Sequence, residues 1–180
     1  AAAPHTDFVI YNIPQLAGVA LSPSLFKKMR ENPNVIGVKN SSMPVQDIQI
    51  FKALGGEDSI VFNGPDEQFV GGRLMGADGG ICGTYGSAQL GMGVAPLDEY
   101  IRAGEAEKAT PIQYAVDEII SALCAGYGSM YAIIKEVLKK REGIDIGGVR
   151  KPQAGVIPED QAVIDHAAEL IDKAMENFIR

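Results

Sequence analysis

The chain has 180 residues, of which 46% are hydrophobic and 22% charged, a composition typical of a globular domain and not of a disordered or fibrous protein. Its formal net charge of −7 argues against a protein that binds nucleic acids or anionic membranes. No apolar run in the sequence reaches the ~18 residues expected of a membrane-spanning helix.

The first half of the chain alternates predicted strands and helices. Strand patterns cover residues 8–12, 35–39, 60–63 and 79–82, and helix patterns cover residues 22–32, 45–54 and 66–75. Ser22 followed by Pro23 is typical of a helix start, and Pro33 forbids continuation of that helix. This β-α-β order with short connections predicts parallel strands joined by right-handed crossovers.

Beyond residue 96 the pattern becomes purely helical. We predict helices at residues 97–103, 105–125, 129–141 and 158–178. One apolar stripe at helical spacing comprises Ile112, Val116, Ile119, Ile120 and Leu123. We interpret this stripe as core or as an oligomer interface.

The strand count indicates a partial barrel. Four parallel strands cannot close a barrel, and a complete (β/α)₈ barrel needs eight strands and ~250 residues. An open sheet of this size would leave two long apolar edges. We therefore predict an α/β fold that is half of a TIM (β/α)₈ barrel over residues 1–94. An all-helical region over residues 95–180 follows and packs on it as a single structural unit.

Polar residues gather just beyond the carboxyl ends of the four predicted strands. They are Tyr11-Asn12, Lys39-Asn40-Ser41-Ser42, Asn63-Gly64 with Asp66-Glu67, and Gly83-Thr84-Tyr85. Active sites assemble at that edge in both barrels and open parallel sheets. The four clusters together predict a site there.

Lys39 ends a short apolar run that predicts a buried strand. An ammonium is costly to bury, which favours a neutral amine, and a neutral amine facing a cavity can attack a carbonyl. Alternation along the strand places Lys39 on the face of Gly37, toward a barrel interior, and Val38 on the helix-covered face. The alternative is a lysine that leaves the strand for solvent.

Tyr11 lies on the preceding strand and alternates with Val9 and Ile13, so its phenol can face the same space as Lys39. A phenol beside an imine can relay protons to and from the substrate oxygen. The alternative is a half-buried strand tyrosine that uses its hydroxyl as a polar handle.

Five segments of the chain together resemble one known superfamily. They are Tyr11-Asn12-Ile13-Pro14, Gly37-Val38-Lys39-Asn40-Ser41-Ser42, Asn63-Gly64-Pro65-Asp66-Glu67, Gly76-Ala77-Asp78-Gly79-Gly80-Ile81 and Arg150-Lys151-Pro152. In this order they resemble the second half of the N-acetylneuraminate lyase and dihydrodipicolinate synthase superfamily. Its members are pyruvate-dependent class I aldolases built on a TIM barrel.

The resemblance implies roles for individual residues. Lys39 matches the Schiff-base lysine, and Tyr11 matches the tyrosine that shuttles a proton during carbon–carbon cleavage. Gly64, Asp66 and Glu67 match a Gly-x-Asp-Glu segment with which sialic acid lyases hold the polyhydroxy tail of the sugar. An Asp-Glu pair that opens a helix is also ordinary capping chemistry, and this alternative stays open for Glu67.

Three departures from the family pattern bear on the substrate. Cys82-Gly83 stands where sialic acid lyases carry a glycine-serine pair, so a hydroxyl contact is lost near Gly83. Ser41 stands where a lyase has threonine. The family's carboxylate-binding Gly-Ser-Thr-Gly-Glu-type loop belongs to the front half of the barrel and does not occur in these residues. With these departures, Ser41, Gly64, Asp66, Glu67 and Gly83 are the expected substrate-binding residues.

Three functions remain open at this stage. The first is an aldolase or lyase that cleaves a 2-keto sugar acid, such as N-acetylneuraminate, to pyruvate and an aldehyde. The second is the reverse reaction type, a condensation of pyruvate with an aldehyde as in dihydrodipicolinate synthase. The third is a non-catalytic half-barrel assembly module. We expect the isolated chain to be weakly active or inactive.

The chemistry implied by the resemblance requires no metal and no organic cofactor, because the substrate forms a covalent Schiff base on Lys39. His5 and His166 have no partners at metal-ligand spacing. The expected partners are a small 2-keto acid and either a second copy of the chain or the missing half-barrel, with no nucleic acid and no membrane.

Location follows from the remaining signals. The first seven residues lack the basic start and apolar stretch of a signal peptide. Cys82 and Cys124 lack disulfide-type spacing, and we interpret both as small buried residues in a reducing compartment. We therefore expect a cytoplasmic protein.

Overall fold

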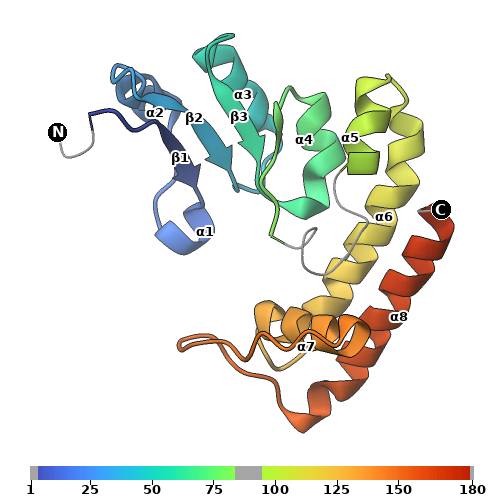
Figure 1. The fold of residues 1–180 in the computed structure, drawn as a ribbon. Coiled ribbons are helices and arrows are strands. Elements are labelled where there is room, and N and C mark those ends of the chain that lie inside the picture. Colours follow the sequence, from blue (N-terminus) through green and yellow to red (C-terminus); the bar gives the residue numbers. More distant parts are fainter. Residues whose placement is uncertain (1–3, 84–94, 179–180) are drawn as a thin grey trace. The chain divides into compact units, whose positions relative to one another are not determined.

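The computed structural model describes residues 4–83 and 95–178, and these form two compact units, Ala1–Cys82 and Gly83–Arg180 (Figure 1). The predicted boundary at residue 94 lies outside the described residues, and the division into residues 1–94 and 95–180 stays a prediction.

The first unit is built on one parallel sheet. Its strands are β1 (Phe8–Asn12), β2 (Val35–Asn40), β3 (Ile60–Asn63) and β4 (Gly79–Gly80), in the spatial order β1-β2-β3-β4. β2 extends one residue beyond its predicted end. β4 is shorter than the predicted 79–82, because its glycines offer no side chains to pack on the neighbouring strand.

Short helices connect the strands. They are α1 (Pro14–Ala17), α2 (Pro23–Met29), α3 (Gln46–Gly55), the 3₁₀ turn η1 (Asp66–Gln68) and α4 (Phe69–Leu74). The Ser22 hydroxyl accepts a hydrogen bond from the backbone N–H of Leu25 at 3.1 Å, as expected of a helix cap. α2 ends before residue 32, and the single-turn α1 was not predicted, because its four residues are too few to show a helical period.

Helices α2 and α3 cover one face of the sheet (Figure 1). Val38 and Val61 on that face are fully buried against Phe26, Ile48 and Phe51. The rings of Phe26 and Phe51 meet edge to face with centroids 5.1 Å apart. The alternation along β2 is therefore as predicted, with Val38 toward the helices and Lys39 on the opposite face.

The second unit is helical. Its elements are α5 (Ala95–Arg102), α6 (Ala106–Leu123), α7 (Met130–Glu142), the 3₁₀ turn η2 (Pro158–Asp160) and α8 (Gln161–Phe178). All five residues of the predicted apolar stripe on α6 are buried. This observation supports the interpretation of the stripe as core.

A buried aspartate organises the segment between α6 and α8. The carboxylate of Asp160 accepts hydrogen bonds from the backbone N–H groups of Ile157, Tyr127 and Gly128 at 2.9, 2.7 and 3.0 Å. The bond from Ile157 is the largest cause of a lowered pKa of Asp160. Asp160 thus ties the chain before α7 to the start of η2.

The two cysteines differ from expectation. Cys124 is exposed and Cys82 is partly buried, so the interpretation of both as small buried residues was wrong for Cys124. Cys124 follows the last residue of α6, where the chain turns toward solvent. His166 is exposed on α8.

Candidate active site

Lys39 and Tyr11 lie side by side at the carboxyl edge of the sheet. They are register partners on the neighbouring parallel strands β2 and β1. The Nζ atom of Lys39 lies 4.4 Å from the centroid of the Tyr11 ring. The face of an aromatic ring attracts a cationic ammonium group, so this contact favours a position of the Lys39 side chain beside Tyr11.

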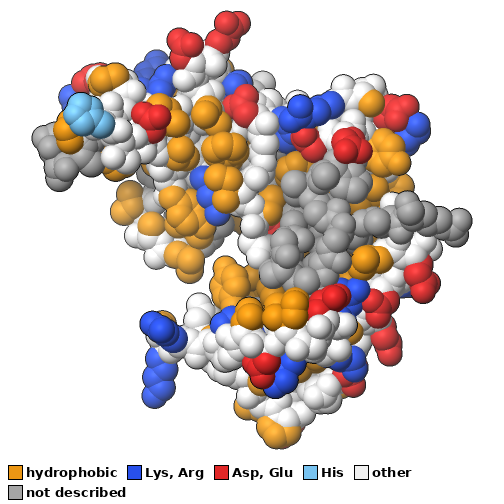
Figure 2. All heavy atoms as spheres, viewed as in Figure 1, with side chains coloured by type: hydrophobic (Ala, Val, Ile, Leu, Met, Phe, Trp, Pro, Cys, Tyr) orange, Lys and Arg blue, Asp and Glu red, His pale blue; other side chains and the backbone are white. Residues whose placement is uncertain are grey.

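The face of the sheet that carries this pair is open within the first unit. Lys39 is partly exposed, Tyr11 is 54% exposed, and Val9 on the same face of β1 is 39% exposed. Figure 2 shows hydrophobic side chains gathered over the strands and α1 of this unit. The expected juxtaposition of amine and phenol is present, whereas the described residues of this unit do not enclose it.

Asparagines occupy the last position of three adjacent strands, and their alignment in one row was not predicted, although each belongs to a predicted polar cluster. Asn12, Asn40 and Asn63 are aligned across β1, β2 and β3, and all three are buried. The Nδ2 of Asn12 donates to Oδ1 of Asn40 at 2.7 Å. The recurrence of asparagine at or directly after the end of these three predicted strands was the signal in the sequence that indicated this row.

Ser41 and Gly64 form a tight backbone junction. The backbone N–H of Gly64 donates to the carbonyl of Asn40 at 2.8 Å. A Cβ added at Gly64 would lie 2.0 Å from Oγ of Ser41. Glycine is therefore required at position 64 by the approach of the Ser41 turn, whatever the role of these residues toward a substrate.

Asp66 and Glu67 differ in exposure although they are adjacent in η1. Asp66 is only 3% exposed, whereas Glu67 is exposed. Burial raises the pKa of the Cys82 thiol, and Asp66 raises it further by its charge and by a side-chain hydrogen bond with the thiol. Lys39 opposes this shift and Glu67 adds to it. These interactions bring Lys39, Asp66, Glu67 and Cys82 into one electrostatic neighbourhood at the edge of the sheet.

Gly83 is the one predicted site residue outside the first unit. It lies exposed in a bend and is the first residue of the second unit. Its assignment to the substrate site stays a prediction. Thr84 and Tyr85, which were grouped with it, lie outside the described residues.

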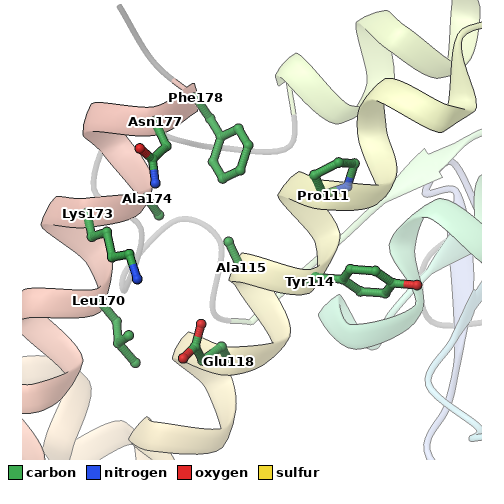
Figure 3. A pocket seen from close by; sticks show the side chains of 9 residues that line it. All are labelled: Pro111, Tyr114, Ala115, Glu118, Leu170, Lys173, Ala174, Asn177 and Phe178. Atoms are coloured by element: carbon green, nitrogen blue, oxygen red, sulfur yellow. The ribbon is translucent and has the colours of Figure 1, made fainter.

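The second unit carries a surface pocket of about 250 Å³ between α6 and α8 (Figure 3). Its apolar floor includes Ala115 and Ala174, and its rim carries the opposite charges Glu118 and Lys173. None of the residues predicted for the site lines this pocket. Apart from Gly83, the predicted site residues that the structure describes therefore lie at the carboxyl edge of the first unit.

The described part of the chain contains no candidate metal-binding site. No group of three or more His, Cys, Asp or Glu side chains is placed there to share a metal ion. Among the helices described, none combines the length and the apolar character needed to cross a membrane.

A parallel β/α unit with its polar residues at the carboxyl edge is the pattern of α/β-barrel proteins. The chain belongs to the dihydrodipicolinate synthetase family, whose model matches residues 1–170. This match confirms the resemblance inferred from the five sequence segments.

Two relatives within the family are N-acetylneuraminate lyases. An N-acetylneuraminate lyase of Mediterraneibacter gnavus is 56% identical over an alignment of 180 positions, which covers 99% of this chain and 56% of that protein. One of Fusobacterium nucleatum subsp. nucleatum is 32% identical over 170 residues, or 94% of this chain and 55% of that protein. The chain thus spans about half the length of the curated relatives it matches.

Solved structures agree with this assignment. The wild-type Ruminococcus gnavus sialic acid aldolase superposes with a TM-score of 0.94 at 56% identity, covering 99% of this chain and 58% of that one. The 4-hydroxy-tetrahydrodipicolinate synthase of Methylacidiphilum fumariolicum SolV shares the fold, with a TM-score of 0.80 at 18% identity. The predicted architecture, half of a (β/α)₈ barrel followed by a helical region, is confirmed.

Proposed function

We propose that Lys39 is the Schiff-base lysine of an aldolase that cleaves a 2-keto sugar acid such as N-acetylneuraminate. The Lys39 amine, once deprotonated, attacks the keto carbon and expels the keto oxygen as water. The resulting iminium accepts the electron pair of the bond between the α- and β-carbons as that bond breaks, which leaves an enamine on Lys39. An aldehyde leaves, the enamine is protonated, and water releases pyruvate from Lys39.

Tyr11 acts in this scheme as the proton carrier. Its phenol first gives its proton to the departing keto oxygen during imine formation, and the resulting phenolate then takes the proton of the aldol hydroxyl as the carbon–carbon bond breaks. The phenol returns that proton when the enamine is protonated. The observation that carries the proposal is the pairing of the two groups, with Nζ of Lys39 4.4 Å from the Tyr11 ring centroid. The N-acetylneuraminate lyases among the relatives support the choice of substrate class.

In this proposal Gly64, Asp66 and Glu67 hold the polyhydroxy tail of the substrate, and Ser41 and Gly83 are further substrate-binding residues. Hydroxyl groups are suited to bind carboxylates, and Asp66 and Glu67 stand together in η1 at the edge that carries Lys39. The reaction needs neither metal nor organic cofactor, since the iminium itself is the electron sink. We expect the reaction to take place in the cytoplasm.

The same chemistry run in reverse condenses pyruvate with an aldehyde, and this synthase direction is the second candidate. A third candidate, an assembly module without activity, is favoured by the open apolar face of the sheet, where Val9 and Tyr11 are exposed. That face and the β1 edge lead us to expect the isolated chain to pair with itself or with the complementary half-barrel, and to turn over poorly alone. A monodisperse and fully active monomer would contradict this expectation.

Reductive trapping tests the proposal. The chain is incubated with borohydride and either N-acetylneuraminate or pyruvate, and its intact mass is measured. We expect one adduct per chain, which Lys39→Arg abolishes and the matched control Lys27→Arg on α2 leaves unchanged. An adduct that persists in Lys39→Arg would refute the assignment, and release of aldehyde from N-acetylneuraminate would distinguish the lyase from the synthase.

A further inference from the structure

Two asparagines join the strands directly behind the candidate catalytic pair. Asn12 follows Tyr11 and Asn40 follows Lys39, so each amide points to the sheet face opposite its neighbour. Asn12 and Asn40 are register partners, only 4% and 0% exposed, and their side chains meet at 2.7 Å. A buried bond therefore links the same two strand ends that present the amine and the phenol.

The bond between the asparagines is part of a longer directional chain. Nδ2 of Asn40 donates to Oγ of Ser42 at 2.8 Å, and that hydroxyl donates to Oδ2 of Asp47 at 2.6 Å. At the other end, Oδ1 of Asn12 accepts from the backbone N–H of Leu21 at 3.0 Å. The final bond to a carboxylate is charge-assisted, and bonds in series polarise one another. We call Asn12, Asn40, Ser42 and Asp47 the asparagine network.

The bond between the two asparagines links the two strands that carry the catalytic pair, and Ser42 and Asp47 continue the network beyond β2 into α3. Asn63 holds the equivalent register position on β3, beside Asn40. Its Nδ2 donates instead to the carbonyl of Pro65, and its Oδ1 is buried without a hydrogen-bond partner. Burial of asparagine at a strand end thus does not by itself create the link, and of the three described strands that end in asparagine, β1 and β2 are joined by a bond between their amides whereas β3 is not.

We propose that the asparagine network is a positioning device that locks the ends of β1 and β2 together and so holds the Lys39 amine against the Tyr11 ring. The inference rests on the proposed function of that pair. Strand ends fray where main-chain pairing stops, and here the last rung is the bond from Ser41 N–H to the Asn12 carbonyl at 2.7 Å. Small displacements of a reacting group reduce rates strongly, so a side-chain lock at this point has a catalytic consequence.

The first test variant is Asn12→Asp, which keeps the shape of the side chain and replaces its donor by an acceptor. A carboxylate oxygen then faces Oδ1 of Asn40, and the link becomes repulsive for as long as Nδ2 of Asn40 keeps its bond to Oγ of Ser42. Asn63→Asp is the matched control, since it makes the same change at the same register position outside the network. Ser42→Ala is a second network variant that leaves the Asn12–Asn40 bond in place.

The first readout reports the position of the amine without any substrate. In chains labelled with ¹³C at lysine Cε, the Lys39 signal is assigned by its loss in Lys39→Arg. The Tyr11 ring shifts this signal, and Tyr11→Leu removes the shift. We expect Asn12→Asp to move the signal most of the way to its Tyr11→Leu position and Asn63→Asp to leave it in place. A folded Asn12→Asp chain with the wild-type shift would overturn the proposal.

The second readout is the rate of borohydride-trapped pyruvate adduct formation. We expect Asn12→Asp to slow trapping about tenfold, with Ser42→Ala intermediate and Asn63→Asp unchanged. If Asn12→Asp fails to fold by circular dichroism, Ser42→Ala decides, and wild-type shift and rate in that variant overturn the proposal. If the wild-type chain forms no adduct, the proposed function fails, and the Lys39 signal alone decides whether the network positions the amine.

Discussion

Replacing Gly64 by alanine places a methyl group where the first unit leaves no room. The added Cβ would lie 2.0 Å from Oγ of Ser41, 2.9 Å from the carbonyl oxygen of Asn40 and 3.0 Å from Cα of Ser41. The hydroxyl can rotate away, whereas the other two atoms belong to the backbone at the end of β2. Relief therefore requires a shift of the strand end that carries Lys39.

The expected cost follows from these contacts. Overpacking a well-packed site lowers the free energy of unfolding by about 1–3 kcal/mol. Because two of the contacts are with backbone atoms, we expect Gly64→Ala to lower it by about 3 kcal/mol, near the upper end of this range. Removing the Ser41 hydroxyl in Ser41→Ala relieves the shortest contact only. The double variant should therefore recover about 1 kcal/mol relative to the sum of the two single changes.

Urea unfolding followed by far-ultraviolet circular dichroism measures these differences. Gly155→Ala is the matched control, because a Cβ at position 155 meets nothing within 4 Å. It should change the free energy of unfolding by less than about 0.5 kcal/mol. If Gly64→Ala were as stable as Gly155→Ala, the close approach of the Ser41 turn would be wrong.

Three further predictions concern the cysteines, Asp160 and the core. Iodoacetamide should modify exposed Cys124 well before Cys82, whose thiol has a raised pKa. Asp66→Asn should accelerate the labelling of Cys82, and a Cys82 labelling rate equal to that of the wild-type chain would contradict the Asp66 contact. The pKa of Asp160 is lowered in the folded state, so its stabilisation is complete above the unfolded-state pKa and is lost as the pH falls through the folded-state value. Asp160→Asn should thus lower the melting temperature by several degrees at pH 7 and by less near pH 3, and an equal loss at both pH values would count against the carboxylate. Phe51→Ala should cost about 3–5 kcal/mol in urea unfolding, because the ring is fully buried between α3 and the sheet, and a loss below 1 kcal/mol would show a looser core.

Strand positions could be predicted because each strand of the first unit is a short apolar run bounded by proline, glycine or polar residues. Alternation then decided the faces correctly, with Val38 buried against the helices and Lys39 paired with Tyr11 on the other side. The strand positions and the direction of their side chains could both be predicted, because each depends on a local pattern that is visible in a single sequence.

What could not be predicted depends on contacts between distant residues. The bond between Asn12 and Asn40 spans 28 positions, and nothing local distinguishes an asparagine that pairs across strands from one in a turn. The hydrogen bond between Asp66 and Cys82 likewise joins residues that are distant in the sequence, and no local pattern predicts it. The exposure of Cys124 follows from where α6 ends, and helix ends are the least certain part of a pattern.

The central claim is that the amine of Lys39 forms a covalent imine, and peptide mapping after reduction with borohydride in pyruvate tests it most directly. The account predicts that the modified peptide contains Lys39 and that every other lysine, including the ion-paired Lys52, stays unmodified. Modification at Lys52 or another lysine, or no modified peptide at all, would contradict it.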